Sequence, residues 1–234
     1  FVVSRPEGVG FLDPRADALP ILDAIDEHAP GRVVSEFLRP ATLDGLLERL
    51  EDTSKPAVDI VHFDGHGVFD RKGGLPKQYA EAHFDRRSEH LREGSPETRE
   101  GEWPANTGYL LFETEEGKPH FVSARTIGEN LHQHNVALVI LSACQSAAVG
   151  GEDDKAEGED TKSAAMGSVA GRLTATGIPS VLAMTHSVLV NTTQALFGQF
   201  YKELARQRSI GEALDNARRW LSNHPEKYEI QRGP

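Results

Sequence analysis

Short apolar runs and longer stretches with helical spacing of apolar residues alternate along the chain. The apolar runs, rich in Val, Ile and Leu, predict strands of a buried sheet, and they are Phe1–Ser4, Arg32–Leu38, Val58–Phe63, Ala137–Ser142 and Ser180–Met184. The stretches between them predict amphipathic helices, and they are Arg15–His28, a helix after Thr42, Arg125–His134, Ser163–Thr176 and two helices after residue 190. This alternation indicates a doubly wound α/β fold with a mostly parallel sheet flanked by helices.

Three regions depart from this alternation. Residues 69–107 are highly charged and have no clear period, so we interpret them as an insertion of loops with a short helix near Tyr79–His90. Tyr109–Glu113 and Pro119–Ser123 then predict a β-hairpin laid on the edge of the sheet. Residues 145–162 are rich in glycine and acidic side chains, which predicts a solvated, flexible loop.

Polar residues mark the starts of several predicted helices. Thr42 precedes a run of leucines at helical spacing, which is typical of an N-cap residue. Asn191 with Gln194, and Ser209 with Glu212, have the spacing of a capping box, in which each residue satisfies a backbone N–H of the first turn. The sequence therefore predicts three specific helix starts.

The composition narrows the class of protein and its partners. A length of 234 residues suits one α/β domain with a full core, so we interpret residues 1–234 as a single domain. The net charge of −11, without a basic patch, argues against binding to nucleic acid or to an anionic membrane. One cysteine excludes an internal disulfide, and we recognise neither a membrane span nor a signal peptide, so the expected location is the cytoplasm.

Chemically reactive side chains follow two of the predicted strands. Cys144, the only cysteine, comes just after the strand Ala137–Ser142, and His66 comes between two glycines after the strand Val58–Phe63. In doubly wound sheets, ligands bind beyond the carboxyl ends of the strands. A thiol needs a basic or cationic neighbour to supply the thiolate near neutral pH. The sequence therefore predicts that Cys144 and His66 meet at one edge of the sheet.

Other interpretations of these residues stay open. A lone cysteine is most often buried and unreactive, and a histidine between glycines can simply order its own turn. His62, Asp64 and His66 form a His-x-Asp-x-His pattern that resembles half of a metal-hydrolase site. On an extended strand His62 and His66 would lie about 13 Å apart. The three could therefore bind one zinc ion only if the chain turned sharply after Phe63.

Two segments resemble the active-site blocks of caspase-like cysteine peptidases. Residues 59–67 are an apolar strand that leads into a His-Gly pair, and residues 138–146 are an apolar strand that leads into an Ala-Cys pair. The strand and helix over residues 177–204 and the helix start Ser209–Leu214 resemble the CHAT branch of this family, and the resemblance covers nearly the whole chain. It implies a caspase-like doubly wound sheet of five to six strands with an inserted β-hairpin.

The resemblance also implies a mechanism. Members of the family are endopeptidases with a Cys–His dyad and no metal or organic cofactor, which makes Cys144 the nucleophile and His66 the residue that transfers protons. The backbone N–H groups of Gly67 and Cys144 would form the oxyanion hole. The residues that would line the pocket for the P1 residue of the substrate are Arg5, Asp64, Ser142, Met184, Thr185 and His186. Caspases have glutamine where this chain has Ser142, so their preference for Asp at P1 does not transfer.

The resemblance finally implies a biological setting. Bacterial relatives commonly accompany helical-repeat or sensor regions, and some act in antiviral defence or cell death. We therefore expect a protein substrate and a regulatory sensor in the same chain or complex. Because Phe1–Ser4 already has the pattern of a strand, and because the family usually has a sixth strand after the last helix, we expect this chain to be a piece of a longer protein.

Two alternatives to a peptidase remain after the resemblance is considered. The first is a catalytically silent CHAT scaffold that only binds partners, and the second is a metal-dependent hydrolase that uses His62, Asp64 and His66.

A further expectation concerns stability. Since Cys144 and His66 are both predicted at strand tips, alanine at either position should abolish cleavage and leave the melting temperature nearly unchanged.

Overall fold

The computed structural model describes residues 1–9, 18–70, 83–84, 107–142, 169–184 and 190–225. The chain divides into two compact units. The first consists of Phe1–Leu12 and Phe37–Ser187, and the second consists of Asp13–Glu36 and Val188–Pro234. None of the helices within the described ranges is long and apolar enough to cross a membrane.

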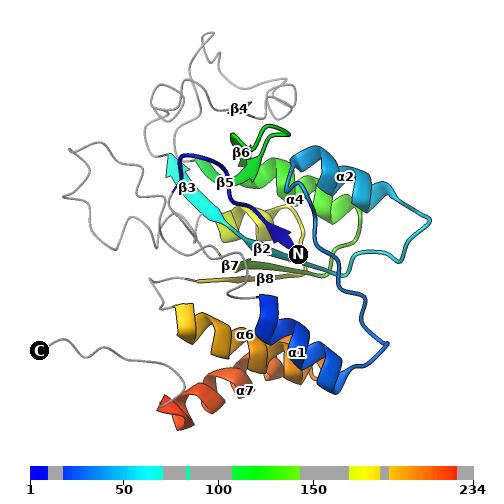
Figure 1. Cartoon of the computed structure of the whole chain (residues 1–234), viewed down its shortest axis with the longest axis vertical. Coiled ribbons are helices and arrows are strands. Elements are labelled where there is room, and N and C mark those ends of the chain that lie inside the picture. The colour runs from blue at the N-terminus through cyan, green and yellow to red at the C-terminus, as the bar shows by residue number, and fades with distance from the viewer. Residues whose placement is uncertain (10–17, 71–82, 85–106, 143–168, 185–189, 226–234) are drawn as a thin grey trace, which may run out of the picture. The chain divides into compact units, whose positions relative to one another are not determined.

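The first sheet is parallel throughout (Figure 1). Its strands are β1 (Val2–Val3), β2 (Ile60–Asp64), β7 (Leu138–Ser142) and β8 (Ser180–Ala183), in the order β1-β2-β7-β8. The apolar runs around Val61, Val139 and Val181 therefore form adjacent strands. A continuous apolar run suits a strand whose two faces are both covered, which is the usual state of parallel sheets. The prediction of an α/β fold with a mainly parallel sheet is confirmed.

The prediction of a strand at Arg32–Leu38 is wrong. Within this stretch only Leu38 pairs with the sheet, through an isolated parallel bridge to Val2, and its N–H donates to the Phe1 carbonyl at 2.9 Å. Val33 and Val34, whose side chains suggested a strand, are 45% and 70% exposed. Apolar side chains stabilise a strand when they pack against neighbours, and these two do not. The parallel sheet therefore has four strands in the described residues, with Leu38 beside β1.

A second sheet follows β2 directly in the chain. Its strands are β3 (His66–Asp70), β4 (His83–Phe84), β5 (Thr107–Glu113) and β6 (Pro119–Ser123), in the order β3-β5-β6-β4. β5 and β6 form the predicted antiparallel hairpin, and β3 pairs antiparallel with β5. The hairpin therefore belongs to a sheet of its own and does not lie on the edge of the parallel sheet.

The predicted insertion at 69–107 is described only in part. Phe69 and Asp70 end β3, His83–Phe84 forms β4, and Thr107 begins β5. The remainder of the insertion, including most of the short helix predicted near Tyr79–His90, lies outside the described residues. The predicted acidic loop at 145–162 lies outside them too.

One hydrophobic core joins the two sheets and the helices of the first unit. Alternate residues of β2 and β7 contribute to it from one face of the parallel sheet, and they are Val61, Phe63, Val139 and Leu141. The helices that contribute are α2 (Leu43–Glu51), α4 (Ala124–Gln133) and the helical residues 169–175. The second sheet contributes Leu110, Phe112 and Val122 to the same cluster. Because this core is shared and closely packed, it holds the second sheet against the end of the first.

Two of the three predicted helix starts are confirmed. The Thr42 hydroxyl accepts from Gly45 N at 3.0 Å at the start of α2. Ser209 and Glu212 form the complete capping box of α7 (Ile210–Asn223). The box predicted at Asn191 is wrong, because α6 (Val190–Ala205) already includes Asn191 as a helical residue.

The second unit contains three helices in its described residues. They are α1 (Ala18–His28), α6 and α7, and α6 contacts both of the others. Ile21 and Ile25 of α1, Phe197 and Phe200 of α6, and Ala213 and Ala217 of α7 are buried. Each of the three helices therefore contributes one apolar face to the core of this unit.

Candidate active site

The carboxyl ends of the parallel strands bring several predicted pocket residues to one edge. Asp64 is the last residue of β2, and it is paired with Ser142, the last residue of β7. Arg5 comes two residues after β1, and Met184 comes directly after β8. These four residues share this edge, which we call the carboxyl edge.

The strand order reverses at β1. Leu38, which precedes β2 in the chain, bridges Val2 on one side of β1, while β2 pairs with β1 on the other. Doubly wound sheets bind ligands at the crevice that such a reversal opens beyond the carboxyl ends of the strands. Arg5 and Asp64 follow the two strands that flank this crevice. The general rule for this class of sheet therefore makes the surroundings of these two residues a candidate site.

His66 opens β3 immediately after a tightly packed glycine. A Cβ atom at Gly65 would lie 2.8 Å from the ring of Phe63, so a larger residue would force the strand ends apart. His66 is paired with Leu111 of β5 and is only 1% exposed. Gly67 follows it in the same strand. The histidine that the sequence placed at a strand tip is thus a buried strand residue at the junction of the two sheets.

The burial of His66 contradicts the reason for expecting an unchanged melting temperature in His66→Ala. Alanine at an exposed strand tip would cost little stability, whereas alanine at a buried position leaves a cavity and removes packing contacts. Because His66 is buried, the premise of an unchanged melting temperature is wrong for His66→Ala. For Cys144→Ala it stays a prediction.

Asp64 forms a largely buried ion pair with Arg5. The distance between Arg5 Nη2 and Asp64 Oδ2 is 2.8 Å, and the two side chains are 17% and 9% exposed. Arg5 Nη1 also donates to the main-chain oxygens of Ser4 at 2.8 Å and of Asp64 at 2.7 Å. Both charges at this end of the carboxyl edge are therefore engaged with each other.

His62 does not join Asp64 and His66 in a metal site. It is buried in the middle of β2, and its ring centroid lies 5.5 Å from that of Phe1. Burial lowers the pKa of His62 to about 3, so its ring is neutral at neutral pH. Within the part of the chain that the structure describes, no group of three His, Cys, Asp or Glu residues could hold a metal ion. The metal-hydrolase alternative gains no support from this geometry.

Three of the predicted site residues are not among the described ones. They are Cys144, Thr185 and His186. The described part of the site therefore consists of His66, Gly67 and the residues of the carboxyl edge, and Cys144 is related to it through the chain, two residues after Ser142.

Two residues that the sequence did not single out support this edge. Ser4 is fully buried, and its hydroxyl donates to the Leu111 carbonyl at 2.6 Å. Glu113 Oε1 accepts from the backbone N–H of Arg5 at 2.5 Å. Ser4 could have been found as the polar residue that ends an apolar strand at the carboxyl edge. Glu113 is 108 residues from Arg5, so no local pattern connects them.

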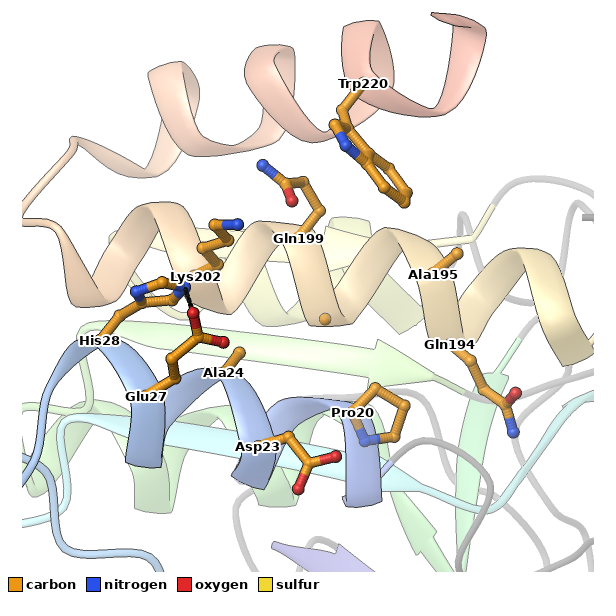
Figure 2. Close-up of a pocket in the computed structure, with 11 residues that line it drawn as sticks. Pro20, Asp23, Ala24, Glu27, His28, Gln194, Ala195, Gln199, Lys202 and Trp220 are labelled. Carbon is orange, nitrogen blue, oxygen red and sulfur yellow. Dashed lines mark ion pairs between the residues drawn. The ribbon is translucent and has the colours of Figure 1, made fainter. Parts of the chain in front are cut away.

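A separate cavity lies in the helical unit (Figure 2). Its volume is about 260 Å³, and its lining residues come from α1, α6 and α7. Small residues such as Ala24 and Ala195 leave the space open, and Trp220 lies to one side of it. Glu27 and His28 form an ion pair at 3.5 Å on the α1 side. None of the predicted site residues lines this cavity.

Comparison with known proteins gives one finding at the level of the family. A family model described as the CHAT domain matches residues 13–232, a range that includes His66 and Cys144. A comparison with curated proteins finds no match.

Proposed function

We propose that this chain, which belongs to the CHAT domain family, is a cysteine endopeptidase that cuts a protein substrate with Cys144 and His66. The family is caspase-like, and the structure has the mainly parallel α/β sheet that such a fold requires. The protease activity and the roles of individual residues are the parts that we propose.

The pairing of Asp64 with Ser142 is the observation that carries the proposal. His66 and Cys144 each come two residues after one member of this pair. Two residues span at most about 7 Å, and adjacent strands lie about 4.8 Å apart. The imidazole and the thiol are therefore tethered to the same edge from neighbouring strands, which supports a dyad.

The chemistry follows from these two groups. The Cys144 thiolate attacks the carbonyl carbon of the scissile bond, the Sγ–C bond forms, and the tetrahedral intermediate collapses as the C–N bond breaks. His66 gives a proton to the leaving amine and then takes one from the water that releases the acyl group. Gly67 contributes a backbone N–H to the oxyanion hole, together with that of Cys144. A glycine suits this task because no side chain shields its amide.

The proposed P1 pocket lies at the carboxyl edge. Ser142 and Met184 line it from the strand ends, and Thr185 and His186 continue from Met184 along the chain, while Arg5 and Asp64, whose charges pair with each other, border it. The reaction needs no cofactor. In the proposed setting, a sensor or repeat region in the same chain or complex controls the peptidase in a bacterial defence or cell-death pathway in the cytoplasm.

A thiol-reactive peptide probe tests the proposal. Because Cys144 is the only cysteine, any labelling of the chain reports on this residue alone. We expect a peptidyl acyloxymethyl ketone to label the wild type and not Cys144→Ala, and a peptide library to be cleaved by the wild type only. His66→Gln should slow labelling strongly. Labelling of His66→Gln at the wild-type rate would contradict the proposed dyad. If the intact chain cleaves no peptide even with its regulatory partner present, the protein is a catalytically silent scaffold.

A further inference from the structure

We infer that Arg5 and Ser4 are positioning residues that fix the location of His66, through hydrogen bonds and an ion pair that join the segment after β1 to both sheets. The inference rests on the proposed function, because it gives His66 the role of the catalytic histidine. It assigns Arg5 a task different from contact with the substrate.

The guanidinium of Arg5 holds the residue that precedes the Gly65–His66 junction. Its Nη2 pairs with Asp64 Oδ2 at 2.8 Å, and its Nη1 donates to the Asp64 main-chain oxygen at 2.7 Å. A planar guanidinium can meet a carboxylate and a carbonyl at once in a fixed geometry. Both the side chain and the backbone of Asp64 are therefore held by one group.

Ser4 holds the residue that lies across the sheet from His66. Its hydroxyl donates to the Leu111 carbonyl at 2.6 Å, and Leu111 is the residue paired with His66. The backbone N–H of Ser4 donates to the Asp64 carbonyl at 2.9 Å. The same dipeptide thus bonds to the residue before the junction and to the residue opposite His66.

Two further contacts make this arrangement tight. The backbone N–H of Arg5 donates to Glu113 Oε1 at 2.5 Å, which ties the dipeptide to the end of β5. A Cβ atom at Gly65 would lie 3.3 Å from Ser4 Cβ, so the dipeptide packs directly on the turn that leads into His66. His66 is consequently enclosed between two anchored neighbours, one along the chain and one across the sheet.

Loss of the Arg5–Asp64 pair should displace the imidazole of His66. Removing one member of a largely buried ion pair leaves the other charge uncompensated, and the strand end must shift to solvate it. A displacement of about 1 Å at a reacting group can cost about 100-fold in rate. Loss of the Arg5 guanidinium should therefore reduce the rate of the chemical step, whereas loss of a substrate contact would change the choice of P1 residue.

Four variants of the full chain separate these two roles. Arg5→Met removes the guanidinium, Asp64→Asn removes its partner charge, and Arg5→Lys keeps the charge without the fork. Arg125→Met is the matched control. Arg125 pairs with Glu129 at 2.7 Å, a distance similar to that of the Arg5–Asp64 pair, but on the exposed surface of α4. Each variant is compared with the wild type by peptide-library cleavage and by NMR of histidine-labelled protein, with the His66 ring signal assigned from His66→Gln.

We expect Arg5→Met and Asp64→Asn to lower kcat by about 10- to 100-fold, with the P1 preference and KM of the best peptide nearly unchanged. The His66 ring signal should shift or broaden in both, Arg5→Lys should restore it partly, and Arg125→Met should match the wild type. A changed P1 preference with an unmoved His66 signal would make Arg5 a substrate-binding residue and overturn the inference. An unmoved signal with wild-type kcat would overturn it as well.

The NMR measurement also separates this inference from the proposed function. If the wild type cleaves no peptide, the proposed function fails while the His66 signal still shows whether Arg5 positions that ring. If the wild type is active and the signal of Arg5→Met is unmoved, only the positioning role fails. Should Arg5→Met fold poorly, Arg5→Lys with the same two measurements decides the question.

Discussion

Each unit of the protein buries a carboxylate, and the two carboxylates are held in different ways. Asp64 pairs with the guanidinium of Arg5 at 2.8 Å, and both side chains are mostly buried. Glu203 of α6 accepts from the side-chain amides of Asn216 at 2.9 Å and Gln199 at 3.3 Å. Its ion pair with Arg206 is longer, at 3.4 Å, and the side chain of Arg206 is 49% exposed.

The contact made by Asp64 depends on its charge, whereas the contacts made by Glu203 are mainly neutral hydrogen bonds. Glu203 joins α6 to α7 mainly by accepting hydrogen bonds from side-chain amides. A neutral glutamine could accept the same bonds, so the charge of Glu203 contributes little to stability. Asp64 joins the end of β2 to the segment after β1, and its partner is a largely buried cation. A change of charge at Asp64 therefore acts on the junction that leads to His66, whereas a change at Glu203 acts on helix packing.

The largest expected effect comes from His66→Ala. This variant removes the histidine that the Arg5–Asp64 pair is inferred to position. Cleavage should be lost, and the free energy of unfolding should fall by about 1–3 kcal/mol because a buried side chain is replaced by a cavity. Peptide cleavage and urea denaturation measure the two effects. His132→Ala, at an exposed position of α4, serves as the control and should change neither. A His66→Ala protein with wild-type stability would mean that the site tolerates an empty space.

The direct comparison sets Asp64→Asn against Glu203→Gln. Asp64→Asn removes the charge that pairs with the Arg5 guanidinium at 2.8 Å and should lower the free energy of unfolding by about 2–4 kcal/mol. Glu203→Gln keeps an oxygen acceptor for Asn216 and should cost less than about 1 kcal/mol. Urea denaturation of the two variants at neutral pH measures the difference. Equal losses would show that the two carboxylates do the same structural work.

A pH titration of stability extends the comparison to His62, which is buried in the first unit. Its pKa is about 3 in the folded state and about 6.5 in the unfolded state. Between these values the unfolded chain binds a proton that the folded chain does not, so stability falls as the pH falls. The slope is about 1.4 kcal/mol per pH unit, or about 2 kcal/mol between pH 6.5 and pH 5. This contribution becomes constant at about one pH unit above 6.5.

His62→Gln tests the origin of that slope by urea denaturation at pH 5 and pH 6.5. The dependence between these values should largely disappear in this variant and should persist in His132→Gln, whose histidine is exposed. Carboxylates with ordinary pKa values titrate mostly below this window and contribute little to it. A slope that survives His62→Gln would assign the acid sensitivity to another group.

The smallest expected effect concerns the helical unit alone. Ser209→Ala removes the hydroxyl that accepts from Glu212 N and should lower the free energy of unfolding by about 1 kcal/mol. Ser209→Gly should lower it by only a few tenths of that amount. Peptide cleavage should not change in either variant. A loss of activity in Ser209→Ala would connect the start of α7 to the active site.

Elements with a strong local pattern could be predicted from the sequence. The strands around Val61, Val139 and Val181 are continuous apolar runs, and the box at Ser209 satisfies backbone N–H groups within four residues. Arg32–Leu38 had a similar pattern and failed, because a strand also needs a neighbour that covers its side chains, and Val33 and Val34 lie exposed. Local pattern alone does not report burial.

The candidate site also combines residues that a local pattern identifies with contacts that no local pattern reports. His66, Gly67 and Asp64 could be named from the sequence because reactive and small residues follow an apolar strand. Their surroundings could not, because a glycine such as Gly65 is compatible with a loop and with a change of sheet. The Arg5–Asp64 pair joins residues 59 positions apart, and no local period connects them.

The sequence by itself determined the family, four of the five predicted parallel strands and the identities of Cys144 and His66 as candidates, since these depend on short motifs and on the order of apolar runs. Only the tertiary structure decided that His66 is a buried residue of a second sheet and that Arg5 is bonded to Asp64 and Glu113. The physical reason is that burial and ion pairing depend on which distant segments meet, and that is set by the packing of the whole core.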